Sequence, residues 1–128
     1  MNYNNYCNVN VLMGKTLSSI TGGAGADELV FVTTTGESYR MYHAQDCCEH
    51  VYLEDVVGDL QDLVGSEILL AEEVSGEGPA DSGDESYYES YTYTFYKFAT
   101  RLGYVDLRWL GTSNGYYSEG VSFQKVED

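Results

Sequence analysis

Basic residues are scarce in this sequence and long apolar runs are missing, and each shortage excludes a class of protein. Six Lys and Arg residues stand against 21 Asp and Glu residues in a chain of 128, giving a formal net charge of −15. Nucleic-acid backbones bind proteins whose cations displace their counterions, so direct nucleic-acid binding is not expected. The same charge argues against docking on an anionic membrane. No apolar run approaches the roughly 18 residues of a membrane-spanning helix.

Cysteine is also scarce, and its placement does not suit disulfides. Cys7, Cys47 and Cys48 are an odd number with two adjacent, whereas a disulfide framework needs pairs that close loops. All three are expected to be thiols in a reducing compartment. The first residues lack a basic region leading into an apolar one, so no export signal is expected. The sequence therefore predicts a cytoplasmic protein without a membrane anchor.

Length and composition predict a single domain over residues 1–128, because 43% hydrophobic and 14% aromatic residues suffice for one packed core. Residues 1–10 are expected to be an N-terminal extension. Residues 75–86 combine Gly, Pro, Ser and acids without a large apolar side chain. They are expected to form a flexible acidic loop.

Charge is unevenly distributed along the chain. No Lys or Arg lies between Arg40 and Lys97, and this interval holds fourteen acids. They are Asp46, Glu49, Glu54, Asp55, Asp59, Asp62, Glu67, Glu72, Glu73, Glu77, Asp81, Asp84, Glu85 and Glu89. The middle segment is therefore expected to carry a strong negative potential.

Runs rich in β-branched and aromatic residues predict mostly strand. The expected strands cover residues 28–33, 37–43, 51–57, 67–74, 91–100, 104–111 and 116–126. The spacing of Leu12, Leu17 and Ile20 favours a short helix or turn within residues 11–20. A second helical turn is expected between Asp59, which suits an N-cap, and Gly65, which suits a C-terminal stop.

Side-chain alternation suggests how the last two strands pair. A three-residue turn with Gly115 in the left-handed conformation would pair Leu107 with Val121 and Val105 with Phe123. Both apolar sets would then lie on one face, which a two-residue turn would not allow. The predicted fold class is α+β and mostly antiparallel β. It has one twisted sheet, a C-terminal three-stranded meander and one or two short helices.

Reactive side chains concentrate in residues 43–50, so a ligand-binding pocket is kept as an alternative function. Adjacent cysteines do not match the spacing of zinc ligands, and the acidic surroundings disfavour a thiolate. No catalytic residue, metal site or cofactor is predicted. A pocket for a small molecule, a nucleotide or a metal remains the alternative. Its residues would be His43, Asp46, Cys47, Cys48, Glu49, Arg108, Asn114 and Tyr117.

Tyrosines gather beside the unpaired acids, and this combination favours a protein interface. Tyrosine offers a large contact area at low entropic cost. Carboxylates on a rigid sheet could imitate the phosphate row of a nucleic acid, and such contacts weaken with salt. The predicted partner-binding residues are Glu72, Glu73, Glu85, Tyr87, Tyr88 and Glu89.

Several motifs resemble an uncharacterised small-domain family of bacteriophages and prophages. They are His-x-x-Asp-Cys-Cys-Glu at 43–49, Glu-Asp-x-x-Gly-Asp-Leu-x-Asp-Leu at 54–63, Ala-Glu-Glu at 71–73, Thr-Phe-Tyr-Lys at 94–97, Gly-Tyr-Val at 103–105, Arg-Trp at 108–109 and Ser-Asn-Gly-Tyr-Tyr-Ser-Glu at 113–119. The resemblance runs from about residue 28 to 124 and implies no established activity. Small acidic phage proteins often inhibit host nucleic-acid enzymes or defence systems, including CRISPR effectors, and this class-level analogy implies a similar role.

The leading functional prediction is therefore a non-enzymatic phage protein in the host cytoplasm. It would bind a host protein at a basic, nucleic-acid-binding groove. The ligand pocket is the alternative hypothesis, and a virion or assembly component is the third. A homodimer is left open.

Overall fold

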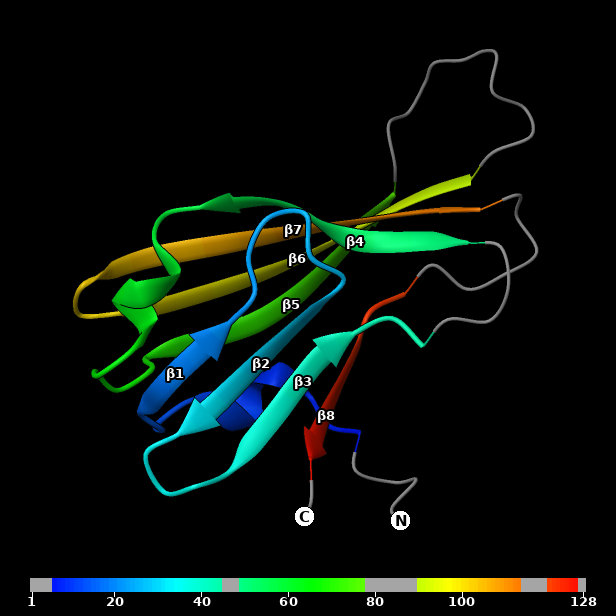
Figure 1. Ribbon diagram of the computed structural model, residues 1–128. Helices are drawn as coiled ribbons and strands as arrows, with labels where there is room; N and C mark the ends of the chain where they lie inside the picture. Colours follow the sequence, from blue (N-terminus) through cyan, green and yellow to red (C-terminus); the bar gives the residue numbers. More distant parts are fainter. Residues whose placement is uncertain (1–5, 45–48, 78–89, 114–119, 127–128) are drawn as a thin grey trace.

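The computed structural model describes residues 6–44, 49–77, 90–113 and 120–126. Within these ranges the chain forms eight strands and two single-turn 3₁₀ helices (Figure 1). The elements are η1 (Val9–Leu12), β1 (Leu17–Thr21), β2 (Glu28–Thr33), β3 (Ser38–Tyr42), β4 (His50–Val57), η2 (Leu60–Leu63), β5 (Leu70–Glu77), β6 (Ser90–Thr100), β7 (Gly103–Ser113) and β8 (Ser122–Val126).

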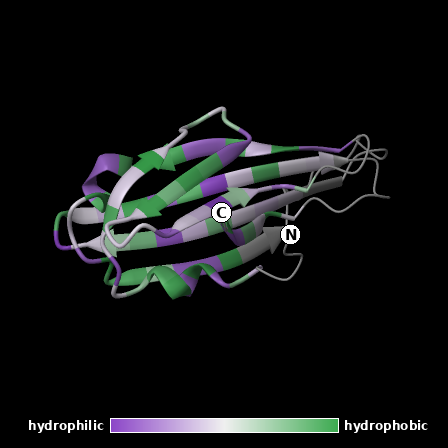
Figure 2. Ribbon diagram, turned by 60° about the horizontal axis from the view of Figure 1, so that its bottom comes forward, coloured by the Kyte–Doolittle hydropathy of each residue, from purple (hydrophilic) through white to green (hydrophobic). Residues whose placement is uncertain are grey.

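The strands form two four-stranded antiparallel sheets that pack as a sandwich. The first sheet has the order β1-β2-β3-β8, and the second has the order β4-β7-β6-β5. Figure 2 shows the two sheets as separate layers. Consecutive hairpins build β1 to β3 and β5 to β7, and the chain changes sheets between β3 and β4 and again between β7 and β8.

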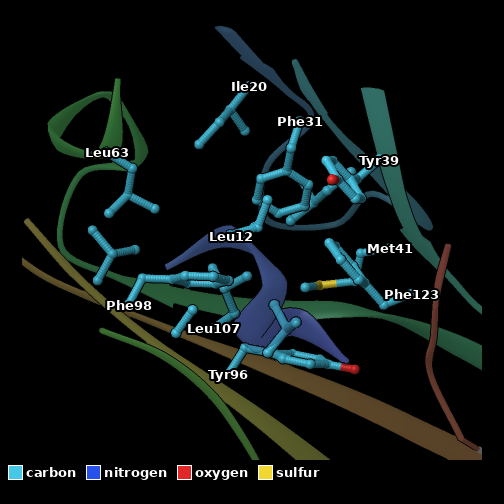
Figure 3. Packing of buried hydrophobic residues seen from close by; sticks show 14 of the residues in the cluster. Leu12, Ile20, Phe31, Tyr39, Met41, Leu63, Tyr96, Phe98, Leu107 and Phe123 are labelled. Carbon is cyan, nitrogen blue, oxygen red and sulfur yellow. The ribbon is translucent and has the colours of Figure 1, made fainter. Parts of the chain in front are cut away.

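The core lies between the sheets because each strand turns alternate apolar side chains inward. Phe31 of β2 and Phe98 of β6 point toward one another from opposite sheets, with ring centroids 6.0 Å apart (Figure 3). The indole N–H of Trp109 on β7 donates to the Sδ of Met41 on β3 at 3.2 Å. Leu12 of η1 is also fully buried in this cluster.

The prediction of a single twisted sheet of α+β class is wrong. The described chain contains two sheets, and its only helical elements are the two 3₁₀ turns. Alternation identifies the side of a strand that is buried, but both layers of a sandwich bury one face against the same core. The pattern therefore does not show to which sheet a strand belongs.

The predicted C-terminal meander is wrong for the same reason. β8 pairs with β3 rather than with β7, and Phe123 lies opposite Met41 rather than Val105. Leu107 lies between Val56 of β4 and Tyr96 of β6. Phe123 and Leu107 face the same core from opposite sheets, and the predicted turn residues 114 and 115 lie outside the described residues.

The expected helix or turn within residues 11–20 is also largely wrong. η1 ends at Leu12, and Leu17 and Ile20 belong to β1. The register of β1 against β2 shifts between Leu17 and Ser19. This bulge turns Leu17 and Ile20 to the same buried face, so a strand acquires the three-residue spacing of a helix.

Other local predictions are confirmed. β2 and β3 form the expected hairpin, and Gly36 in its turn has a φ of 93°. The side chain of Asp59 accepts a hydrogen bond from the backbone N–H of Gln61 at 2.9 Å, as an N-cap does. Cys7 is a half-buried free thiol, while Cys47 and Cys48 lie outside the described residues. No helix in the described ranges has the length and hydropathy to cross a membrane.

Candidate functional site

Two of the six predicted partner-binding residues lie on β5, at one edge of the second sheet. Glu72 and Glu73 are neighbours on this strand, and both are exposed. The other four, Glu85, Tyr87, Tyr88 and Glu89, lie outside the described residues. The testable part of the predicted acidic surface is therefore the β5 edge.

Neighbouring residues of a strand point to opposite faces, so Glu72 and Glu73 have different surroundings. Glu72 shares the outer face of the sheet with Lys97, its register partner on β6. Glu73 lies opposite the buried Tyr96, on the side of the sheet that faces the core. The edge thus presents one carboxylate on each side of the strand.

Burial raises the pKa of the Glu73 carboxyl group, while a hydrogen bond from the Tyr96 hydroxyl opposes this rise. Burial also raises the pKa of the Tyr96 phenol, and the nearby Glu73 carboxylate raises it further. The phenol oxygen has no partner of strict hydrogen-bond geometry among the described residues.

Most cations of the molecule are occupied elsewhere. Arg40 pairs with Glu28, with Nε 2.5 Å from Oε2. Arg108 pairs with Glu54, with Nε 2.7 Å from Oε1. The two lysines Lys15 and Lys125 share a third carboxylate, that of Glu37, with Nζ–O distances of 3.1 and 3.7 Å.

The β5 acids lack such partners. Within the part of the chain that the structure describes, neither Glu72 nor Glu73 forms an ion pair. Even Lys97, the cation opposite Glu72, is not within ion-pair distance of it. No described cation therefore forms an ion pair with the carboxylates of this edge.

A second candidate site is a polar cavity of about 320 Å³ where the ends of β2 and β3 meet the start of β4. Its lining residues are Asp27, Glu28, Arg40, Tyr42, His43, His50 and Val51. The guanidinium carbon of Arg40 lies 3.8 Å from the centroid of the Tyr42 ring. The cavity thus offers a cation, two imidazoles and two carboxylates around one space.

His43 is held rigidly beside this cavity. Its Nδ1 lies 2.7 Å from the carbonyl oxygen of Gly120, and its Nε2 lies 2.7 Å from Oε2 of Glu49. A carbonyl only accepts hydrogen bonds, so Nδ1 donates to Gly120, and Nε2 faces the Glu49 carboxyl group. Both side chains are buried, with 4% and 0% of their surfaces exposed. This pair joins the end of β3 to the residue before β4.

The structure brings together only part of the predicted pocket. His43 and Glu49 are in contact, but Arg108 lies on the outer face of the second sheet with Glu54 and Asp55. The cation that lines the cavity is Arg40 instead. The remaining five predicted residues, Asp46, Cys47, Cys48, Asn114 and Tyr117, lie outside the described ranges.

Sequence reasoning missed Arg40, Tyr42, Glu28 and His50 as cavity residues. A signal for the first three was present in the β2–β3 hairpin, because Arg40 and Tyr42 share a face and Glu28 lies opposite Tyr42. His50 carried no such signal, since it comes from the other sheet. Among the described residues, no group of three or more His, Cys, Asp and Glu side chains is arranged to hold a metal ion.

The fold and these sites define a small antiparallel β-sandwich with an acidic sheet edge and a polar cavity. The family described as a domain of unknown function, DUF7448, matches residues 10–123. The chain belongs to this family. The match begins ahead of the resemblance expected from about residue 28, so it includes β1 and the last residues of η1. No curated protein and no solved structure matches the chain.

Proposed function

We propose that the chain is a non-enzymatic protein-binding module that occupies a basic, nucleic-acid-binding surface of a partner protein. The β5 edge, with Glu72 and Glu73, supplies the charged contacts. In the bacteriophage setting that the sequence motifs suggest, the partner is a host defence or nucleic-acid-handling enzyme, and the module inhibits it by competing with nucleic acid.

The observation that carries this proposal is that two adjacent acids on one edge strand are exposed and unpaired, whereas three acids elsewhere in the sandwich are ion-paired. Glu28, Glu37 and Glu54 each have a cation within 4 Å. Glu72 and Glu73 are exposed and have none among the described residues. Unpaired carboxylates attract an oppositely charged surface during diffusion, and they lose no internal ion pair when they bind it.

A competition experiment tests the proposal. The tagged protein captures partners from a host lysate at low salt, and a purified captured protein is then tested for nucleic-acid binding with and without the module. The proposal expects the module to displace nucleic acid. The double variant Glu72→Lys with Glu73→Lys should weaken binding to the partner by about tenfold or more, since charge reversal adds repulsion to lost attraction.

The matched control reverses two acids outside β5, of which Glu67 lies three residues before the strand begins. Asp27 and Glu67 are exposed, and neither is ion-paired among the described residues. The double variant Asp27→Lys with Glu67→Lys therefore changes the net charge by the same amount, from −15 to −11. Equal losses in both double variants would show that net charge, rather than the β5 edge, governs binding. No loss in either would refute the proposal.

The polar cavity favours a second candidate function, the binding of a small anionic ligand. Arg40 would supply the positive charge, and its stacking on Tyr42 fixes its position. A ligand that binds the folded state raises the unfolding temperature as its concentration rises. A thermal-shift series with nucleotides should then stabilise the natural chain and leave Arg40→Gln unchanged. If no nucleotide raises the unfolding temperature, this second candidate fails.

A further inference from the structure

The edges of the two sheets are not equally protected. An uncovered edge strand exposes backbone N–H and C=O groups that can pair with another strand. The edge of β4 is covered by the β1–β2 connection. Gly25 donates its N–H to the carbonyl of Leu53 at 2.7 Å, and Leu53 donates its N–H to the carbonyl of Ala26 at 2.8 Å.

Both edges of the other sheet also receive backbone hydrogen bonds. At β8, the N–H of Cys7 donates to the carbonyl of Phe123 at 3.0 Å. At β1, the N–H of Gly65 donates to the carbonyl of Leu17 at 2.9 Å. Segments that precede or follow the strands thus protect three of the four edges at least in part.

β5 differs from these three strands. Over Leu70–Glu77 its backbone pairs with β6, and it forms no backbone hydrogen bond with any other described segment. η1 packs near β5 but donates no backbone hydrogen bond to it. Among the described residues, no segment is therefore hydrogen-bonded to the second edge of β5, and an additional strand could pair there.

Side chains along β5 indicate what kind of strand would fit. Val74 is 44% exposed and lies on the outer face opposite Phe95, which in turn packs near Tyr93 with ring centroids 6.0 Å apart. Glu72 lies on the same face, and Glu73 lies on the opposite face. An added strand would therefore meet one carboxylate on each side and an apolar surface on the outer side.

Charge argues against a second copy of this chain as the occupant. Two β5 edges pairing with one another would bring the Glu72 and Glu73 carboxylates of both copies together. Like charges on neighbouring strands are destabilising. A basic segment would instead form cross-strand ion pairs with the same carboxylates.

We propose that the open edge of β5 accepts an extended basic segment of a partner protein by β-strand addition. Two consecutive Lys or Arg residues of the segment contact Glu72 and Glu73, one on each face, and an adjacent apolar residue contacts Val74. Backbone hydrogen bonds hold the segment, and the charges select it. This inference rests on the proposed function, because it specifies how the acidic edge binds its partner.

The test uses the full chain and two synthetic peptides of equal charge. The first is a ten-residue peptide of Val and Thr with a central Lys-Arg pair. The second has the same sequence with alternate backbone nitrogens methylated, which removes the donors that strand addition needs. The first peptide should slow hydrogen exchange at alternate β5 amides, and methylation should weaken its binding by about tenfold or more.

The outcomes separate this inference from the proposed function. If both peptides bind equally and with the same salt dependence, strand addition is wrong, while an acidic surface that attracts cations remains. If neither peptide binds, strand addition is also overturned, and the nucleic-acid competition experiment decides the proposed function independently. If the free protein dimerises and Glu72→Lys makes it monomeric, the strand added to the β5 edge comes from a second copy of the chain. The basic segment would then be ruled out as the occupant.

Discussion

Glu73 of β5 and Tyr96 of β6 lie directly opposite one another, so an exposed carboxylate borders a fully buried phenol. Tyr96 packs in the core beneath the edge, and the Glu73 carboxyl group is partly buried next to it. Because burial raises the pKa of Glu73, the folded protein holds a proton on this group more tightly than the unfolded chain does. The stability contribution of the protonated form is therefore lost as the pH rises through the raised pKa.

This relationship predicts that Glu73→Gln stabilises the protein at pH 7. Glutamine keeps the shape of the side chain and removes a charge that burial disfavours. The gain in free energy of unfolding should disappear at a pH below the ordinary glutamate pKa, where the natural side chain is also protonated. Urea unfolding of both proteins over this pH range measures the effect. Glu72→Gln is the control, and an equal gain there would contradict the explanation.

Breaking the buried pair of His43 and Glu49 should cost far more. Glu49→Ala leaves the His43 imidazole buried without its hydrogen-bond partner, and an unsatisfied buried polar group costs about 1–3 kcal/mol. Urea unfolding at pH 7 provides the measurement. The double variant His43→Phe with Glu49→Leu should lose less than the single variant, because it leaves neither side chain buried without its polar partner. A single-variant loss below about 1 kcal/mol would show that the contact is not important for stability.

Gly58 should be irreplaceable at the end of β4. Its φ is 103°, and an added Cβ would lie 2.5 Å from the carbonyl oxygen of Tyr104. Gly58→Ala therefore combines backbone strain with a steric clash and should lower the free energy of unfolding by about 1–3 kcal/mol. Gly23 has no positive φ, and its added Cβ would contact nothing within 4 Å. Gly23→Ala should be close to neutral, and equal effects at both positions would contradict the prediction.

The substitution Met41→Ala tests how much the packing between the two sheets contributes to the free energy of unfolding. Its Sδ accepts the Trp109 N–H across the interface between the layers. Met41→Ala removes this contact and leaves a cavity, which should cost about 2–5 kcal/mol by thermal or urea unfolding. The exposed Leu102, at 53% exposure, provides the control. Leu102→Ala should change stability by less than about 0.5 kcal/mol, and a similar loss at both positions would argue against a shared core.

Most strand positions could be read from the sequence, β1 (Leu17–Thr21) excepted, but their assignment to sheets could not. The β2–β3 hairpin follows from alternation around a glycine turn, and the cap of η2 follows from Asp59. Pairing of β8 with β3 depends on contacts between residues about 80 positions apart. No local pattern distinguishes a strand that continues a sheet from one that crosses to the facing layer.

The candidate sites were predictable to different extents. The exposed acids on β5 follow from charge and strand parity, which are local properties. The cavity depends on three-dimensional proximity, so Arg108 was expected there but Arg40 lines it. The open edge of β5 could not be foreseen, because it depends on which loops cover the other three edges.

The association rate of a purified partner, measured against salt concentration, tests most directly whether the β5 carboxylates direct binding. The natural chain should associate about tenfold or more slowly when salt rises from low to physiological concentration. The Glu72→Lys, Glu73→Lys variant should lose most of this dependence, while the Asp27→Lys, Glu67→Lys variant retains it. Identical salt dependence in all three proteins would contradict the account.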